Sequence, residues 1–458
     1  MATQTINRKS LKALIWLVFM LVFSAFQPFS VFGLNAAQNA AAIIVLTAAV
    51  LWVSEWVPLF VVSFLILAME LIWLSPLLAA QKASFDTQIF FAPFFSQIIL
   101  LFLAGFVLSQ LLQKYNLDIH FAHFLLRRSQ GNPQRIILAL IVAGAFLSMW
   151  MSNTATTAMM LAICMPLIRQ LPAQDNYRTA IILAIPFACN LGGMGTPIGT
   201  APNAIALSYL HGIGIQLSFA HWMLLAVPFM SLLLVILWRL LLWMYPSQTQ
   251  CIELTKTHFD QFDGQQKFVI GIFAVTIFGW LFGGQIGLST GMVSLLPIIA
   301  SFWFGLLTAD DFRSLSWDVL FMVAGGLALG VAVVETGLGE ELVAFLPTGL
   351  AFPVLIVLVV VINSIASVVM SNTATAGLMI PVVISLPLPI MQVAVLVVMV
   401  TLSCSLGMVL PVSTPPNAIA FSSGVLTSKQ LVRGGLGIAL IGTLLLLILG
   451  PTYLQWVL

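Results

Sequence analysis

Two copies of one polar sequence interrupt long apolar stretches of this chain. The first reads MSNTATTAMM at residues 151–160, and the second reads MSNTATAGLM at residues 370–379. Serine, threonine and asparagine side chains both donate and accept hydrogen bonds, and the start of a helix adds free N–H groups that favour anions. A duplicated, uncharged polar site inside hydrocarbon is typical of a transporter of polar solutes.

A second pair of sequences follows the first. GTAPNAIAL occupies residues 199–207 and STPPNAIAF occupies residues 413–421. The copies of the first pair are 219 positions apart, and those of the second pair are 214 apart. Proline removes a backbone donor and glycine permits turns, so we expect each of these sequences to break a membrane helix. Broken helices at matching positions of two halves mark binding sites in secondary transporters.

The composition places the chain in a membrane. Of its 458 residues, 61% are hydrophobic and 7% are charged, whereas soluble domains carry about 25% charged residues. A water-soluble fold cannot hide this much apolar surface, so we expect an all-α polytopic membrane protein. Neither the four cysteines nor the five histidines have metal-site spacing, and no cluster suited to catalysis lies in the apolar core. An enzyme and an organic cofactor are therefore not expected.

Thirteen apolar segments organise the chain. Two of them, 136–168 and 353–389, carry an SNT sequence near the middle, and the other eleven are candidate membrane spans. These eleven lie at 14–32, 40–57, 59–74, 95–112, 179–210, 221–245, 268–282, 288–307, 317–334, 393–421 and 436–457.

The distribution of basic residues indicates that the two SNT segments are re-entrant hairpins. With the N-terminus in the cytoplasm and both segments returning to their starting side, 15 of the 16 Lys and Arg residues, Lys256 among them, lie inside, and only Lys82 lies outside. We therefore expect a first membrane helix in 1–39, a repeat at 40–245 with its hairpin at 136–168, a cytoplasmic linker at 246–267, and an inverted repeat at 268–458 with its hairpin at 353–389. This arrangement places the C-terminus outside.

The hairpin tips are the expected binding residues. Ser152, Asn153 and Thr154 lie where a second helical arm begins, and Ser371, Asn372 and Thr373 repeat them. Free N–H groups at each helix start favour an anion, while spare carbonyl and side-chain oxygens suit a hard cation such as sodium.

Formal charge is absent from much of the second half. No Asp, Glu, Lys, Arg or His occurs between Leu342 and Ser428. A dianion there needs co-bound cations, because helix ends contribute only about 0.3–1 kcal/mol each. We place Glu55 and Glu70 at the ends of spans, interfacial or paired, and not as coupling groups.

The paired SNTAT and T-x-P-N sequences resemble those of the divalent anion/sodium symporter family, the sodium–dicarboxylate cotransporters. Residues 50–65 (VLWVSEWVPLFVVSFL) also resemble that family's WxTExxPL segment, with Ser54 in place of the usual threonine. The resemblance implies an elevator-type homodimer in the plasma (inner) membrane, with sodium ions co-transported and both hairpins on the moving part.

The resemblance also implies further site residues. Ser148 and Ser367 match sodium-site positions, as do Ser152, Asn153 and Asn372 and the backbone at Gly195, Gly199 and Val412. Thr200, Thr414 and Pro416 would lie beside the anion. The chain departs from the family pattern at Ala201, which is often proline, and the copies differ at Thr157 and Ala376.

The expected function is sodium-coupled symport of C4-dicarboxylates such as succinate, malate or fumarate. Because some members exchange anions without sodium, a dicarboxylate or citrate exchanger remains an alternative, as does a sulfate transporter of the same fold. An anion channel is the alternative from another class.

Overall fold

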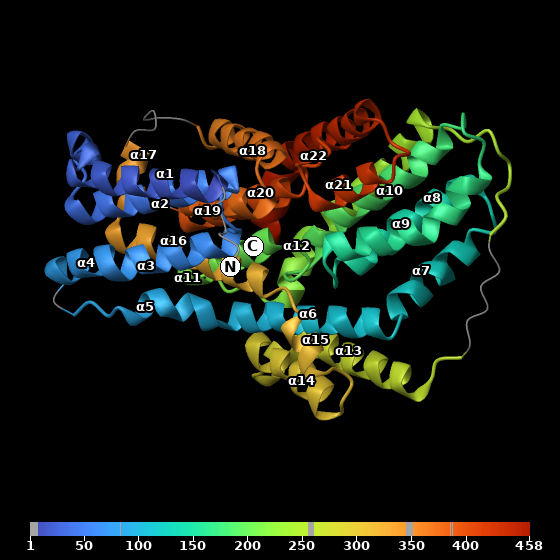
Figure 1. Ribbon diagram of the computed structural model, residues 1–458, viewed down its shortest axis with the longest axis horizontal. Coiled ribbons are helices and arrows are strands. Elements are labelled where there is room, and N and C mark those ends of the chain that lie inside the picture. Colours follow the sequence, from blue (N-terminus) through green and yellow to red (C-terminus); the bar gives the residue numbers. More distant parts are fainter. Residues whose placement is uncertain (1–7, 83, 255–260, 345–350, 385, 387) are drawn as a thin grey trace, which may run out of the picture.

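The chain is helical throughout its described part. The computed structural model describes residues 8–82, 84–254, 261–344, 351–384, 386 and 388–458, which contain no strand (Figure 1). Lys256 and positions 255–260 of the expected linker lie outside the described residues. The first half contains α1 (Arg8–Ala25), η1 (Pro28–Phe32), α2 (Ala36–Ser54), α3 (Leu59–Met69), η2 (Glu70–Leu74), α4 (Ser75–Gln81), α5 (Gln88–Phe91), η3 (Ala92–Phe95), α6 (Gln97–Lys114), α7 (Leu117–Arg128), α8 (Pro133–Ser148), α9 (Asn153–Gln170), α10 (Tyr177–Gly192), η4 (Gly193–Gly195), α11 (Ala201–Gly212) and α12 (Phe219–Met244).

The second half follows a similar order. It contains α13 (Gly264–Phe282), η5 (Gly283–Ile286), α14 (Thr290–Trp303), α15 (Ala309–Arg313), α16 (Trp317–Thr336), α17 (Leu338–Ala344), α18 (Phe352–Val369), α19 (Asn372–Ile384), α20 (Ile390–Cys404), α21 (Pro415–Ser422) and α22 (Ser428–Val457).

Nine helical stretches among the described residues are long and apolar enough to cross a membrane. They include α2, α12, α16 and α22, together with the hairpin arm α18. Four further apolar helices, α8, α14, α19 and α20, are shorter than 18 residues. The all-α membrane class is therefore confirmed, whereas the number of eleven spans stays a prediction.

Both expected helix breaks are present. The chain leaves α10 at Gly192 and resumes a helix at Ala201, and it leaves α20 at Cys404 and resumes at Pro415. Proline occupies the first turn of both α11 and α21, where its missing N–H costs no helical hydrogen bond. The intervening residues are mostly buried, so their polar backbone groups need partners inside the protein.

The broken helices interlock the two halves. The hairpin arm α9 packs against α21, and the hairpin arm α19 packs against α11, so each hairpin contacts the broken helix of the other half. Helix α16 lies against α2, α3 and α11. In Figure 1, α16 is on the left and α7–α9 are on the right. This packing brings residues at least 160 positions apart into contact at the breaks.

Candidate functional site

The first SNT turn brings three oxygen atoms together. The Ser148 hydroxyl at the end of α8 contacts Oδ1 of Asn153 and lies 2.8 Å from the backbone oxygen of Cys189. Because a hydroxyl carries one hydrogen, it donates to only one of these acceptors at a time. Ser152 caps α9, and its side chain accepts a hydrogen bond from the Ala155 amide at 3.2 Å. An oxygen cluster thus lies at the start of a helix.

The second SNT turn repeats this geometry. The Ser367 hydroxyl lies 2.8 Å from Oδ1 of Asn372 and 2.8 Å from the backbone oxygen of Cys404. The Ser371 side chain accepts from the Ala374 amide at 3.2 Å, as a helix cap does. The two SNT turns therefore share the same hydrogen-bond contacts as well as the same residues.

Glycines let the broken loops approach both clusters. A Cβ atom on Gly193 would lie 2.8 Å from Oδ1 of Asn153, and one on Gly407 would lie 2.4 Å from Oγ of Ser367. Cβ atoms essentially never come within 3.0 Å of such neighbours. Any side chain at either glycine would therefore collide with the oxygen cluster.

Neutral oxygen ligands define what these clusters can bind. Each combines a hydroxyl, an amide oxygen and a backbone carbonyl, which are ligands for hard cations. No group of three or more His, Cys, Asp or Glu side chains in the described part of the chain could hold a metal ion. The arrangement thus fits a weakly held monovalent cation better than a transition metal.

The asparagine of each T-x-P-N sequence holds the loop that interrupts the helix. The Asn203 amide donates to the backbone oxygen of Thr196 at 2.7 Å, and the Asn417 amide donates to those of Met408 and Leu410 at 2.8 and 3.0 Å. Both asparagine side chains are fully buried. The threonines and prolines of these sequences were expected at the site, whereas the two asparagines were missed, although their duplication in the sequence could have indicated them.

A hydrogen-bond network joins the two halves of the chain. Asn190, buried on α10, donates to Oγ1 of Thr414 at 3.2 Å and lies 3.4 Å from Oδ1 of Asn417. The matching acceptor in the first half, Oδ1 of Asn203, is buried without a hydrogen-bond partner. Asn190 lies outside both repeated sequences, so no sequence signal pointed to it.

The remaining expected residues of the second sequences lie at helix starts. Thr414 is the N-cap of α21, and its side chain accepts from the Asn417 amide at 3.3 Å. Pro416 is buried in the first turn of the same helix. Thr200 is the N-cap of α11 and is half-buried, with no side-chain cap hydrogen bond.

The three backbone positions differ in their surroundings. Gly195 and Gly199 are buried in the first broken loop, where a Cβ on Gly199 would lie 2.4 Å from the backbone oxygen of Gly193. The Val412 side chain is 83% exposed. Only its backbone can contribute to a cation site in this conformation.

The two hairpin tips are unequally covered. Ser152 and Thr154 are exposed, whereas their counterparts in the second tip are half-buried. Thr373 lines a narrow space whose walls include Trp52 of α2 and Ile205 of α11. The first tip is therefore the more accessible one in this conformation.

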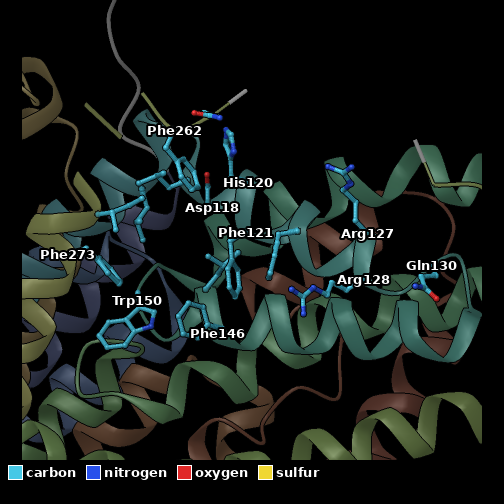
Figure 2. A pocket seen from close by; sticks show the side chains of 16 residues that line it. Asp118, His120, Phe121, Arg127, Arg128, Gln130, Phe146, Trp150, Phe262 and Phe273 are labelled. Atoms are coloured by element: carbon cyan, nitrogen blue, oxygen red, sulfur yellow. The ribbon is translucent and has the colours of Figure 1, made fainter. Parts of the chain in front are cut away.

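A cavity lies beside the first tip and not between the tips. Figure 2 shows this cavity of about 810 Å³, whose lining includes Phe146 and Trp150 of the first hairpin, Phe273 of α13, and Asp118 and Arg128 of α7. Burial raises the pKa of the Asp118 carboxyl. The lining is mainly apolar and carries neither oxygen cluster, so this cavity is not the anion site that the repeats predict.

We expect Asn203→Asp to destabilise the protein although it preserves size. A carboxylate cannot donate to the carbonyl oxygens that the Asn203 amide satisfies, and unpaired buried groups cost about 1–3 kcal/mol each. The measurement is thermal unfolding of the purified protein. Asn176→Asp, at an exposed site with no cap hydrogen bond, is the control. Equal melting temperatures for the two variants would contradict the loop-holding role of Asn203.

Fold and site together define a polytopic membrane transporter, and comparison with known proteins gives the family. Residues 49–402 match the family model CitMHS, described as a citrate transporter. The chain belongs to this family, and its resemblance to the divalent anion/sodium symporters is confirmed.

Three relatives indicate the range of this similarity. The chain is 27% identical to an uncharacterized transporter, C3B8.04c, of Schizosaccharomyces pombe over 92% of its own length, and it spans about half (50%) of that relative. It is 30% identical to an uncharacterized transporter of Haemophilus influenzae, covering 89% of this chain and 90% of the relative. It is 28% identical to the sodium-dependent dicarboxylate transporter SdcS of Staphylococcus aureus, covering 87% of this chain and 82% of that protein.

A solved structure shows a related fold. The YdaH transporter of Alcanivorax borkumensis, whose topology is described as unusual, aligns with a TM-score of 0.56 at 13% identity. The alignment covers 84% of this chain and 97% of that one. This likeness concerns the fold alone.

Proposed function

We propose that the protein is a secondary transporter that carries C4-dicarboxylates across the plasma (inner) membrane together with sodium ions. The observation that carries the proposal is the duplicated cluster of Ser, Asn and carbonyl oxygens at the ends of α8 and α18. A dianion that is not neutralised by basic side chains needs other positive charge beside it. Two matching cation sites next to two helix N-termini would supply that charge. The sodium dependence named for the SdcS relative agrees with this.

The anion is proposed to lie between the two hairpin tips. Each tip presents a helix N-terminus, capped by Ser152 or by Ser371, whose remaining N–H groups point away from the helix. One carboxylate of the dianion would meet each N-terminus, with Thr200 and Thr414 beside it. Because the T-x-P-N helices contact the opposite hairpins, both halves would form one binding unit.

Alternating access is proposed to follow an elevator mechanism in a homodimer. The hairpins and broken helices would move together, with α2, α3 and α16 among the static helices. In this scheme the N-terminus lies in the cytoplasm and the C-terminus outside. The greater exposure of the first tip is consistent with a state open toward the cytoplasm.

Uptake by purified protein in liposomes tests the proposal. We expect labelled succinate to accumulate under an inward sodium gradient, and replacing sodium by potassium to lower the rate at least about tenfold, equivalent to ~1.4 kcal/mol. Excess malate or fumarate should compete. Citrate, sulfate and phosphate serve as alternative competitors that reveal a different anion preference.

Two results would replace sodium-coupled symport by another transport mode. Accumulation that requires preloaded internal anion and ignores the sodium gradient would make the protein an exchanger. An anion flux per protein far above the turnover rate of a carrier would make it an anion channel.

A further inference from the structure

Glu70 is a buried acidic residue that the site described above does not use. It lies midway along the 23-residue helical stretch Leu59–Gln81, which is long enough to span a membrane. From the sequence, Glu70 was expected at the end of a span, and that expectation is wrong because α3, η2 and α4 form one continuous helix. At 1.5 Å per residue, Glu70 is about 17 Å from either end, at the depth of the bilayer centre.

Neither carboxyl oxygen of Glu70 has a hydrogen-bond partner. The residue is 0% exposed, and both Oε1 and Oε2 are buried without a partner. Buried carboxylates in proteins are normally paired with a cation or with donors, because the charged form is otherwise poorly solvated. Such surroundings favour the neutral carboxyl group, which carries a bound proton.

The backbone is irregular at the same position. Residues Glu70–Leu74 form a π-helix, in which the Ser75 amide donates to the backbone oxygen of Glu70. Single π turns inside α-helices occur frequently at functional sites. The carboxyl group and the helix irregularity therefore coincide in the middle of the span.

The surroundings of Glu70 join it to the helix that begins at Thr200. Tyr209 of α11 is buried and lies within electrostatic range of Glu70. The Tyr209 hydroxyl donates to the backbone oxygen of Gly326 on α16 at 2.8 Å. Its ring lies so close to Gly330 that a Cβ there would be 1.8 Å from the hydroxyl oxygen. Tyr209 thus fills a glycine-lined notch in α16 near the acid.

No basic group faces Glu70 from the packed elements in the described part of the chain. Segment η2 packs against α2, α3 and α4, whose helical residues carry no other titratable side chain. On the adjoining α16, Asp318 and Glu335 lie at opposite ends, and Glu335 pairs with Lys82 at 2.7 Å. On α11, Tyr209 is buried and His211 is exposed. A proton is therefore the available neutralising partner.

We propose that Glu70 is a proton-binding site at the membrane midplane, and that its protonation stabilises the contact between α11 and α16. Loss of the proton would place an unpaired negative charge beside the Tyr209 notch, and the ionised carboxylate would compete with the Gly326 carbonyl for the Tyr209 hydroxyl. The contact that holds α11 against α16 would weaken. Since α11 begins at the T-x-P-N sequence, the proton would influence the position of the proposed anion site.

Infrared spectroscopy tests the protonation directly and does not depend on the proposed function. We expect purified protein in liposomes to show a protonated-carboxyl C=O band at a pH where exposed carboxyl groups are ionised. Glu70→Gln should remove the Glu70 component of this band, which appears in the difference spectrum even if the buried Asp118 carboxyl also contributes. Glu253→Gln, which changes an exposed glutamate outside the helices, is the matched control and should retain it. Absence of the band in the unaltered protein, or an undiminished band in Glu70→Gln, would overturn the proposal.

Transport measurements test the consequence of protonation and rest on the proposed function. We expect uptake by the unaltered protein to fall as pH rises, by at most about tenfold per pH unit, the limit for one titrating group. Glu70→Gln mimics the protonated acid, so its uptake should lack this component, while Glu253→Gln should keep it. Titration of the substrate affects all three proteins equally. An unchanged pH profile in Glu70→Gln would refute the coupling of Glu70 to transport.

These two measurements separate the possible failures. If succinate is not the substrate, the infrared band still decides whether Glu70 holds a proton. If the band is present and uptake has the same pH profile in both variants, Glu70 is a neutral structural acid and the proposed link to α11 is wrong.

Discussion

Asn372→Ala is expected to lower sodium-dependent uptake severely. Asn372 lies at the start of α19, and its Oδ1 lies 2.8 Å from the Ser367 hydroxyl. The substitution removes one oxygen from the proposed cation cluster and one amide donor from the hairpin tip. Loss of a polar partner in a buried site costs about 1–3 kcal/mol, and the proposed cation and anion sites would both be affected, so the rate should fall about 10- to 100-fold or more.

The measurement is sodium-driven uptake together with the sodium concentration that gives half the maximal rate. Asn153→Ala should behave similarly, because the Ser148 contact repeats in the first hairpin. Asn39→Ala, which changes a buried asparagine on α2, is the control and should keep its sodium response. Normal sodium-driven transport in both hairpin variants would refute the assignment of the oxygen clusters.

A single methyl group at Gly407 is expected to disrupt the second cluster. In Gly407→Ala the new Cβ would lie 2.4 Å from Oγ of Ser367 and 2.6 Å from its backbone carbon and oxygen. Since backbone atoms cannot rotate away, α18 and the loop that follows α20 must separate. Overpacking of this kind costs about 1–3 kcal/mol, and the displaced Ser367 can no longer contact Asn372 and Cys404 together.

Two readouts separate the loss of the site from general instability. Gly407→Ala should lower the melting temperature and should also remove the stabilisation that added sodium gives to the unaltered protein. Gly271→Ala on α13 is the control, because no atom lies within 4 Å of its added Cβ. Sodium stabilisation of Gly407→Ala equal to that of the control would show that this cluster does not bind the ion.

The sequence predicted the membrane class, the broken helices and the location of the hairpin turns. Long apolar runs force backbone groups to pair within helices, and that requirement acts locally on each segment. Glycine and proline likewise act on their own backbone, which is why the interruptions at 193–200 and 405–414 were predictable. The identical SNT sequences predicted identical turns. The Ser148 and Ser367 hydroxyls make matching contacts with backbone oxygens, in agreement with this prediction.

Residues whose roles depend on distant partners were not predictable in this way. Asn190 resembles any polar residue in an apolar helix until α10 is packed beside α21, where Thr414 accepts its hydrogen bond. Glu70 was misplaced because hydropathy alone ended its span at residue 74, whereas the helix continues to Gln81. Its lack of partners depends on all the elements packed around it and on no single segment.

The amino-acid sequence by itself determined an all-helical membrane protein with two copies of an uncharged polar turn, since hydropathy and backbone chemistry are local properties. Only the tertiary structure decided that each hairpin rests on the other half's broken helix, that Asn203 and Asn417 hold those breaks, and that an unpaired acid lies at mid-span. Such outcomes depend on which surfaces meet, and close packing joins residues that are hundreds of positions apart.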